Sequence, residues 1–103
     1  MTTNYKIEYL PSFYNDLEKI VEYIAYELKN IYAANNLIDK IELEINRRAL
    51  TPESYEIYKS AKKRKDIYYR IYVKNYTIFY IVKENTMEVR RILHSKRNLE
   101  KYI

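Results

Sequence analysis

Arg70 is the first residue whose setting in the sequence could do chemistry. It lies between Tyr68 and Tyr72, so in a strand the three side chains would share one face. An arginine beside two rings can hold a phosphate and stack bases. The same pattern also fits a solvated cation flanked by surface tyrosines, which exposed sheet faces commonly carry. Without further neighbours, the second interpretation is favoured.

The C-terminal segment carries another group of chemically useful residues. His94 is the single histidine of the chain, and histidine is the side chain whose ordinary pKa lies near neutrality. With Arg97 and Tyr102 it could transfer protons and stabilise a phosphate. A surface histidine in a basic tail is the alternative. Glu53 and Glu56 are candidate carboxylate bases, although isolated loop acids are mostly structural.

Basic residues are concentrated in the second half of the chain. Residues 1–51 hold 6 Lys/Arg and 8 Asp/Glu, a net of −2. Residues 52–103 hold 13 and 6, a net of +7, and the two halves sum to the net charge of +5. Such a half can face a polyanion, because lysine and arginine displace counterions from phosphates. A well-solvated basic surface is the alternative. The candidates for RNA contact are Lys59, Lys62, Lys63, Arg64, Lys65 and Arg91.

The alternation of the last strand is irregular around two arginines. Arg91 shares parity with Leu93, whereas Arg90 shares parity with Ile92. One arginine must therefore point where simple alternation places an apolar residue. A β-bulge would explain this, and so would a functional cleft that accepts the local inconsistency.

The composition of the 103 residues excludes several classes of chemistry. The absence of cysteine excludes disulfides, thiolate metal sites and cysteine nucleophiles. The absence of glycine excludes glycine-rich phosphate loops, and a single histidine argues against a zinc enzyme. We therefore expect no metal and no cofactor. RNA cleavage without a metal needs a base, cations around the phosphate and an acid, and the basic half holds such residue types.

Periodicity predicts the elements that must position these residues. Residues 5–10 alternate as a strand that Pro11 ends. A helix follows, with Ser12 as its N-cap and with Asn15 and Asp16 near its first amides. Its apolar face carries Phe13, Leu17, Ile20, Val21, Ile24 and Leu28. A second helix begins after Asn30, forms an antiparallel hairpin with the first and ends at residues 51–52.

The second half of the chain predicts a three-stranded antiparallel meander. Tyr, Ile and Val are frequent in residues 67–73, 76–83 and 87–94. Asn75 and Asn85 would supply the positive φ that glycine usually provides in hairpin turns. Four alternating residues of the first strand would face the helices: Ile67, Tyr69, Ile71 and Val73. The result is an α+β fold over residues 1–103, one domain, with the N-terminal strand at an edge of the antiparallel sheet.

Two longer segments resemble a known family. Residues 72–80 (YVKNYTIFY) and 89–98 (VRRILHSKRN), together with the order of elements, resemble the RelE/ParE superfamily of type II toxin–antitoxin toxins. The N-terminal strand, the helix around Tyr23-Ile24 and the helix with Ala33-Ala34 also match its usual pattern. RelE-like members are ribosome-dependent mRNA endonucleases without a metal cofactor. ParE-like members inhibit DNA gyrase and are not known as nucleases.

The resemblance also implies roles for single residues. Arg70 resembles the strand arginine that stabilises the scissile phosphate in the nuclease branch, and Arg97 resembles an arginine near the end of the last strand. His94 and Tyr102 resemble catalytic residues of different members. Lysines of residues 59–63 occupy the loop region where RelE-like enzymes place essential lysines. The ending around His94 also resembles the ParE branch, although Asn98 stands where aspartate is common.

The basic half favours ribosome-dependent mRNA cleavage as the activity. A ParE-like inhibitor of DNA gyrase, or an inactive homologue acting as co-repressor with its antitoxin, are the alternatives. The implied partners are an acidic antitoxin encoded by a neighbouring gene and either the ribosome with mRNA or gyrase. No apolar run could span a membrane and no apolar leader is present, so we expect a soluble, cytoplasmic protein.

Overall fold

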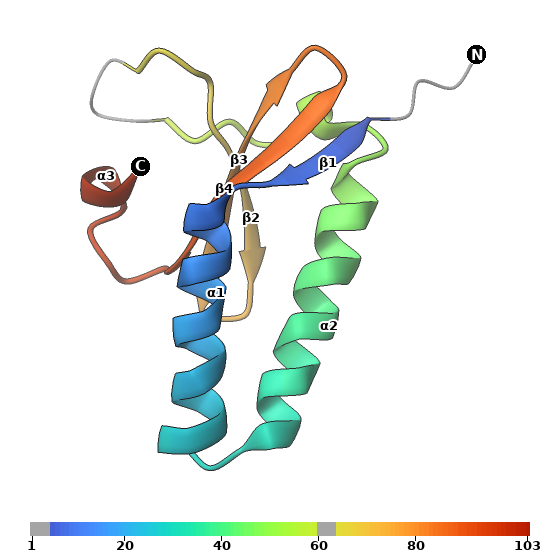
Figure 1. Cartoon of the computed structure of the whole chain (residues 1–103). Coiled ribbons are helices and arrows are strands. Elements are labelled where there is room, and N and C mark those ends of the chain that lie inside the picture. Colours follow the sequence, from blue (N-terminus) through green and yellow to red (C-terminus); the bar gives the residue numbers. More distant parts are fainter. Residues whose placement is uncertain (1–4, 60–63) are drawn as a thin grey trace.

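A computed structural model describes residues 5–59 and 64–103. The expected order of elements is confirmed: a strand, two helices and three strands (Figure 1). The elements are β1 (Lys6–Tyr9), α1 (Pro11–Glu22), a π-helical turn η1 (Tyr23–Glu27), α2 (Ile31–Arg48), a 3₁₀ turn η2 (Pro52–Ser54), β2 (Tyr69–Val73), β3 (Tyr76–Lys83), β4 (Thr86–His94) and α3 (Leu99–Tyr102). Figure 1 shows α1 and α2 side by side as a hairpin, with the short α3 near the C-terminus beyond the sheet.

The sheet has the strand order β1-β4-β3-β2. The predicted meander is confirmed, because β3 pairs antiparallel with both β2 and β4. The strand β1 lies at the edge beside β4 and pairs with it in parallel, with Tyr9 opposite Val89. The sheet is therefore mixed rather than antiparallel throughout. Parallel pairing is possible because a long stretch of chain, including both helices, connects β1 to β4 and lets the two strands run in the same direction.

The helices cover one face of the sheet, and the core lies between them. Tyr69, Ile71 and Val73 are buried there as predicted, but Ile67 is 61% exposed because β2 begins only at Tyr69. The remaining buried core residues come from both layers: Phe13, Ile24, Ala34, Leu37, Ile41, Ile45, Ile78, Tyr80, Met87, Val89 and Ile92. The fully buried Tyr80 donates its hydroxyl to the Pro52 carbonyl at 2.8 Å, which satisfies its polar end.

The start of α1 differs from the prediction. Its N-cap is Leu10, which makes no side-chain capping bond, and Pro11 occupies the first helical turn. Proline suits that position because its missing N–H would have no intrahelical partner. The Ser12 hydroxyl instead donates to the Arg90 carbonyl at 2.7 Å. In α2 a side-chain cap is present, because Asn30 Oδ1 accepts from the Ala33 N–H at 3.0 Å.

The hairpin turns also differ in detail from the prediction. The positive φ angles belong to Lys74 (53°) and Glu84 (55°), each the first residue of its turn, and not to Asn75 or Asn85. A two-residue turn that matches the twist of the strands needs a positive φ at its first position. Lysine and glutamate therefore adopt the left-handed conformation that glycine favours elsewhere.

Candidate functional site

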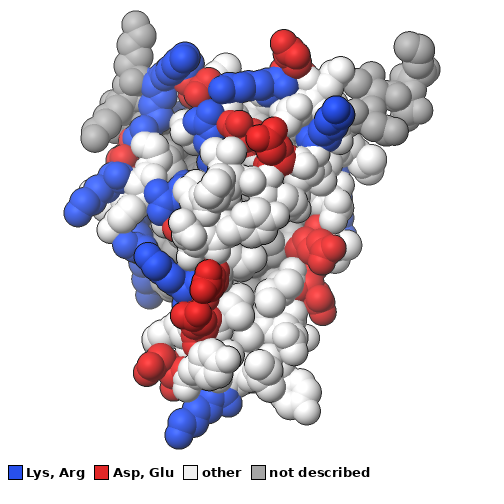
Figure 2. Space-filling model, viewed as in Figure 1, with Lys and Arg blue, Asp and Glu red and all other residues white. Residues whose placement is uncertain are grey.

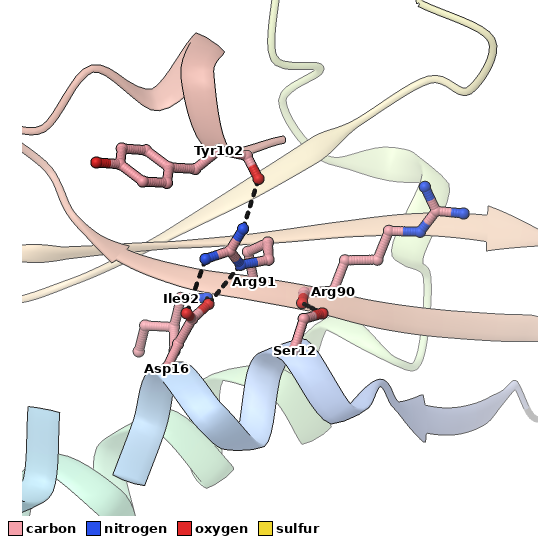
Figure 3. Close-up of polar contacts among 6 residues, drawn as sticks. All are labelled: Ser12, Asp16, Arg90, Arg91, Ile92 and Tyr102. Atoms are coloured by element: carbon pink, nitrogen blue, oxygen red, sulfur yellow. Dashed lines mark hydrogen bonds and ion pairs between the residues drawn. The ribbon is translucent and has the colours of Figure 1, made fainter. Parts of the chain in front are cut away.

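The two arginines of β4 lie at a β-bulge, as the irregular alternation predicted. Phe79 lies opposite Arg91, whereas its neighbour Tyr80 lies opposite Val89, so Arg90 is the additional residue. A bulge re-aims the side chains beside it. Arg90 Nε donates to Glu88 Oε2 at 2.7 Å, and Arg90 Nη1 donates to the Tyr68 hydroxyl at 2.8 Å. Figure 3 shows that the guanidinium groups of Arg90 and Arg91 point in different directions, with that of Arg91 toward Asp16 and Tyr102.

Helix α1 continues along the edge of β4 where β1 ends. Figure 3 shows Ser12 and Asp16, one helical turn apart, facing this edge. Ser12 binds the Arg90 carbonyl, and Asp16 Oδ2 accepts from the Ile92 N–H at 3.1 Å. The same carboxylate binds Arg91 through two bonds, Nε to Oδ2 at 2.6 Å and Nη2 to Oδ1 at 2.8 Å. The sequence predicted Asp16 near the exposed amides of the first turn, but no acidic residue lies in that turn. Asp16 instead links α1 to the bulge.

Arg91 also holds the C-terminal segment. Its Nη1 donates to the Tyr102 carbonyl at 2.6 Å (Figure 3). Hydrogen bonds to Asp16 are the largest cause that raises the pKa of Arg91, so this guanidinium stays charged. Three of its nitrogens thus contact protein groups. The suggested RNA contact of Arg91 stays a prediction, and its observed partners are Asp16 and Tyr102.

His94, Arg97 and Tyr102 meet at one cavity of about 590 Å³ between α1, β4 and the C-terminal segment. The cavity is lined by charged, aromatic and aliphatic residues and one amide: Asp16, Lys19, Ile20, Tyr23, Leu28, Asn75, Tyr76, Arg91, Ile92, Leu93, His94, Arg97 and Tyr102. This volume lies within the range of about 300–1,000 Å³ that is typical of ligand pockets. Three of the four predicted catalytic residues are therefore neighbours.

Contacts with neighbouring residues fix the His94 and Tyr102 rings at this cavity. His94 Nδ1 accepts from the Lys96 N–H at 3.2 Å, so in the neutral ring Nε2 carries the proton. Its ring is half-buried and lies 5.5 Å, centroid to centroid, from the Tyr76 ring. The Arg97 guanidinium lies 4.2 Å from the centre of the Tyr102 ring. Arg97, by hydrogen bonding first and then by its charge, lowers the pKa of the Tyr102 hydroxyl.

Arg70, the fourth predicted catalytic residue, lies at a different cavity. That cavity is lined by Arg70, Tyr55, Glu56, Ile57 and Lys59. Arg70 forms an ion pair with Glu56, which is the largest cause that raises its pKa. Its guanidinium lies over the rings of Tyr72, at 5.2 Å, and Tyr58, at 5.5 Å. The expected aromatic setting is thus present, with Tyr58 in the place expected for Tyr68.

Tyr58 reaches Arg70 because residues 56–58 run beside β2. The Tyr58 N–H donates to the Tyr68 carbonyl at 2.7 Å, and Ile57 forms an isolated bridge with Tyr69. The other candidate carboxylate, Glu53, accepts a hydrogen bond from the Tyr5 hydroxyl at 3.3 Å. Neither Glu53 nor Glu56 lines the cavity of His94.

The basic residues between 59 and 65 that were predicted to contact RNA lie in different environments. Lys59 is exposed beside Arg70, and Lys65 is exposed as well. Arg64 Nη2 binds the Glu100 carboxylate at 2.5 Å and Nη1 binds the Ile103 carbonyl, so Arg64 also holds α3. Lys62 and Lys63 lie outside the described residues. Figure 2 shows lysines and arginines gathered over the sheet and the C-terminal segment with acidic groups between them, whereas the helical half carries acidic and basic groups at its sides and an uncharged surface between them.

Within residues 5–59 and 64–103, no group of three or more His, Asp or Glu side chains is arranged to hold a metal ion. No helix in these ranges is both long and apolar enough to cross a membrane.

Comparison with known proteins identifies the family. The model of the ParE toxin of the type II toxin–antitoxin system parDE matches residues 7–99. The chain belongs to the ParE toxin family. This ParE-family toxin is thus the toxin component of a type II toxin–antitoxin system, within the RelE/ParE superfamily. None of the curated proteins matches it.

Solved structures share the fold of this ParE-family toxin. A chain of the chromosomal ParDE system from P. aeruginosa has a TM-score of 0.75 at 11% identity, covering 91% of this chain and 99% of that chain. A chain of the RelB–RelE antitoxin–toxin complex from Methanococcus jannaschii has a TM-score of 0.51 at 27% identity, covering 93% and 99%. YafQ from E. coli has a TM-score of 0.52 at 18% identity, covering 96% and 99%.

Two residues of this toxin's site were not assigned their observed roles by the sequence. Asp16 looked like a favourable charge near the start of a helix, and Tyr58 lay in a segment without periodicity. The available signal for Asp16 was its spacing of four residues from Ser12, which places both side chains on one helix face. For Tyr58 the signal was weaker, because residues 55–58 (YEIY) alternate over only four positions.

Proposed function

We propose that this ParE-family toxin acts by binding DNA gyrase rather than by cutting mRNA. The observation that carries the proposal is the separation of Arg70 from His94, Arg97 and Tyr102, which line different cavities. Metal-free RNA cleavage requires the phosphate-stabilising cation and the proton-transfer groups to act on one phosphate. Arg70 is also paired with Glu56, which offsets its charge toward a phosphate. The match to the ParE family supports the same direction.

Ribosome-dependent mRNA cleavage remains the second candidate function, and a specific observation favours it. His94, Arg97 and Tyr102 share one cavity, and Arg97 lowers the pKa of the Tyr102 hydroxyl. A more acidic phenol is a better source of phenolate near neutral pH and could act as a base. In this mechanism Arg97 would stabilise the phosphate without Arg70.

A cognate antitoxin is the partner that controls the toxin in this proposal. One of the similar structures is described as the RelB–RelE antitoxin–toxin complex. This chain carries a net charge of +5, so an acidic antitoxin would be attracted to it and steered toward its basic half.

Paired assays test the proposal. Purified toxin should stop plasmid supercoiling by gyrase and leave mRNA on programmed ribosomes intact, and added antitoxin should restore supercoiling. Cleavage of ribosome-bound mRNA with normal supercoiling would overturn the proposal in favour of the second function. If toxin that binds its antitoxin is inert in both assays, the proposal also fails and a co-repressor role is favoured.

A further inference from the structure

The cavity at His94 has two walls of different character. On the helical side Ile20, Tyr23 and Leu28 present an apolar surface. Tyr23 is 53% exposed and Leu28 is 56% exposed, although both face a concave surface. On the other side the C-terminal segment contributes Arg97 and Tyr102. An apolar wall facing a cationic wall can bind a group that is itself amphipathic.

The charged side chains at the cavity differ in whether they have an oppositely charged partner. The cations that line it are Lys19, Arg91 and Arg97, and the acid is Asp16. Asp16 is bound to Arg91, and neither Lys19 nor Arg97 has a carboxylate partner within residues 5–59 and 64–103. Two positive charges are therefore available to a partner that brings a carboxylate.

We infer that this cavity binds a peptide segment of a partner protein that carries an aliphatic or aromatic side chain next to a carboxylate, and that Asp16 and Arg91 position the C-terminal wall for it. The apolar side chain would lie against Ile20, Tyr23 and Leu28. The carboxylate would pair with Arg97 and Lys19. The inference needs a protein partner of the toxin but does not depend on whether the target is gyrase or the ribosome.

A peptide fits the cavity better than a nucleic acid does. Nucleic-acid binding depends mainly on a series of cations that neutralise successive phosphates. Of the three cations at this cavity Arg91 is already bound to Asp16, which leaves Lys19 and Arg97 beside the apolar wall. Two cations beside such a wall offer little to a sugar–phosphate backbone. Protein interfaces, by contrast, combine an apolar centre with a charged rim.

The positioning role of Asp16 and Arg91 follows from how α3 is held. None of the residues Leu99–Tyr102 is buried, so this short helix has no apolar anchor of its own. Arg91 binds the Tyr102 carbonyl at 2.6 Å, and Asp16 holds the guanidinium through two bonds. Arg64 also binds α3, through Glu100. Loss of the Asp16–Arg91 pair would therefore loosen the Tyr102 end of α3 at the cavity and leave the apolar wall in place.

Peptide binding to the purified full-length chain tests the inference. The probe is a fluorescein-labelled amphipathic peptide with glutamates on one face and leucines and a phenylalanine on the other, and its fluorescence anisotropy is measured. Control peptides replace either all glutamates by glutamine or all apolar residues by serine. The protein variants are Arg97→Glu and Tyr23→Ser for the two walls. Lys40→Glu, an exposed charge reversal on α2, is the matched control.

The expected result is that both wall variants weaken binding of the acidic peptide by about tenfold or more, whereas Lys40→Glu keeps wild-type affinity to within about twofold. Both control peptides should bind more weakly than the probe. Equal affinity of the two wall variants and the wild type would overturn the inference. So would an RNA oligonucleotide that displaces the peptide and loses affinity in Tyr23→Ser.

The positioning role has its own readout. Arg91→Lys keeps the charge but cannot reproduce the paired bonds to Asp16. It should weaken peptide binding and also shift the tyrosinate absorbance of Tyr102, since the contact of Tyr102 with Arg97 changes when the bond to the Tyr102 carbonyl is lost. Circular dichroism and urea unfolding establish that the variant is folded. A folded Arg91→Lys protein with unchanged peptide affinity and unchanged Tyr102 titration would show that the pair has only a structural role.

Discussion

Asp16 of α1 binds Arg91 of β4 through both of its carboxylate oxygens, across 75 residues of sequence. The Asp16 carboxylate also accepts the Ile92 N–H, so one side chain satisfies a guanidinium and a backbone group of the strand edge. Its side chain is only 13% exposed and that of Arg91 is 24% exposed. Asp16 therefore joins the helical hairpin, the β-bulge and, through Arg91, the C-terminal segment.

Replacement of Asp16 by asparagine should destabilise the toxin clearly. The change removes the charge of the pair and leaves the part-buried Arg91 without its counter-ion, at a cost of about 2–4 kcal/mol of unfolding free energy. Urea unfolding at neutral pH measures the difference. Glu18→Gln, an exposed change two residues along α1, is the matched control and should stay within about 0.5 kcal/mol of the wild type. Equal stability of the two variants would contradict the role of Asp16.

The turn residues predict a stabilising change. Lys74 has a φ of 53°, a conformation that costs a non-glycine residue about 1–2 kcal/mol. Lys74→Gly should therefore raise the unfolding free energy by roughly 0.5 kcal/mol, after the greater chain entropy of glycine is subtracted. Asn75→Gly is the control and should not stabilise, because Asn75 does not have the positive φ. Stabilisation by Asn75→Gly instead would mean that the turn is built as the sequence suggested.

The sequence predicted the meander well and the site less well, for physical reasons. Strand bounds depend on local alternation, so residues 76–83 were recognised without any knowledge of their partners. The bulge was also visible, because Arg90 and Arg91 interrupt that alternation. The partner of Arg91 was not visible, since the parallel pairing of β1 with β4 determines where α1 meets the strand. No local pattern encodes that register. For the same reason the sequence does not show that Arg70 and the C-terminal residues line different cavities.

Burial of tyrosines predicts that the protein loses stability at alkaline pH. Burial raises the pKa of five tyrosines above the ordinary value of 10.0: Tyr9, Tyr58, Tyr69, Tyr76 and Tyr80. The folded state then binds protons more tightly than the unfolded state. The stabilisation is present below about pH 10 and is lost as the pH rises further. Urea unfolding measured from about pH 8 to pH 11 should show this fall.

Tyr80 should make the largest contribution to this loss of stability at alkaline pH, because burial raises its pKa more than that of the other four tyrosines. Tyr80→Phe should cost about 1 kcal/mol at neutral pH through loss of the bond to the Pro52 carbonyl. It should also reduce the decrease in stability with pH, because one buried proton-binding group is gone. An unchanged slope in this variant would refute the assignment to Tyr80.

The pKa of Tyr102 is shifted in the opposite direction, below the ordinary value for tyrosine. Arg97 lowers the pKa of the Tyr102 hydroxyl, chiefly by hydrogen bonding and then by charge. Tyrosinate absorbance should therefore show an early phase that disappears in Tyr102→Phe and moves to higher pH in Arg97→Gln. Lys101→Gln is the matched control, and its effect should be smaller because the charge of Lys101 ranks below that of Arg97. The same variants separate the two candidate functions, since mRNA cleavage with Tyr102 as the base would be lost in Tyr102→Phe. Cleavage that persists undiminished in Tyr102→Phe would remove the residue from that mechanism.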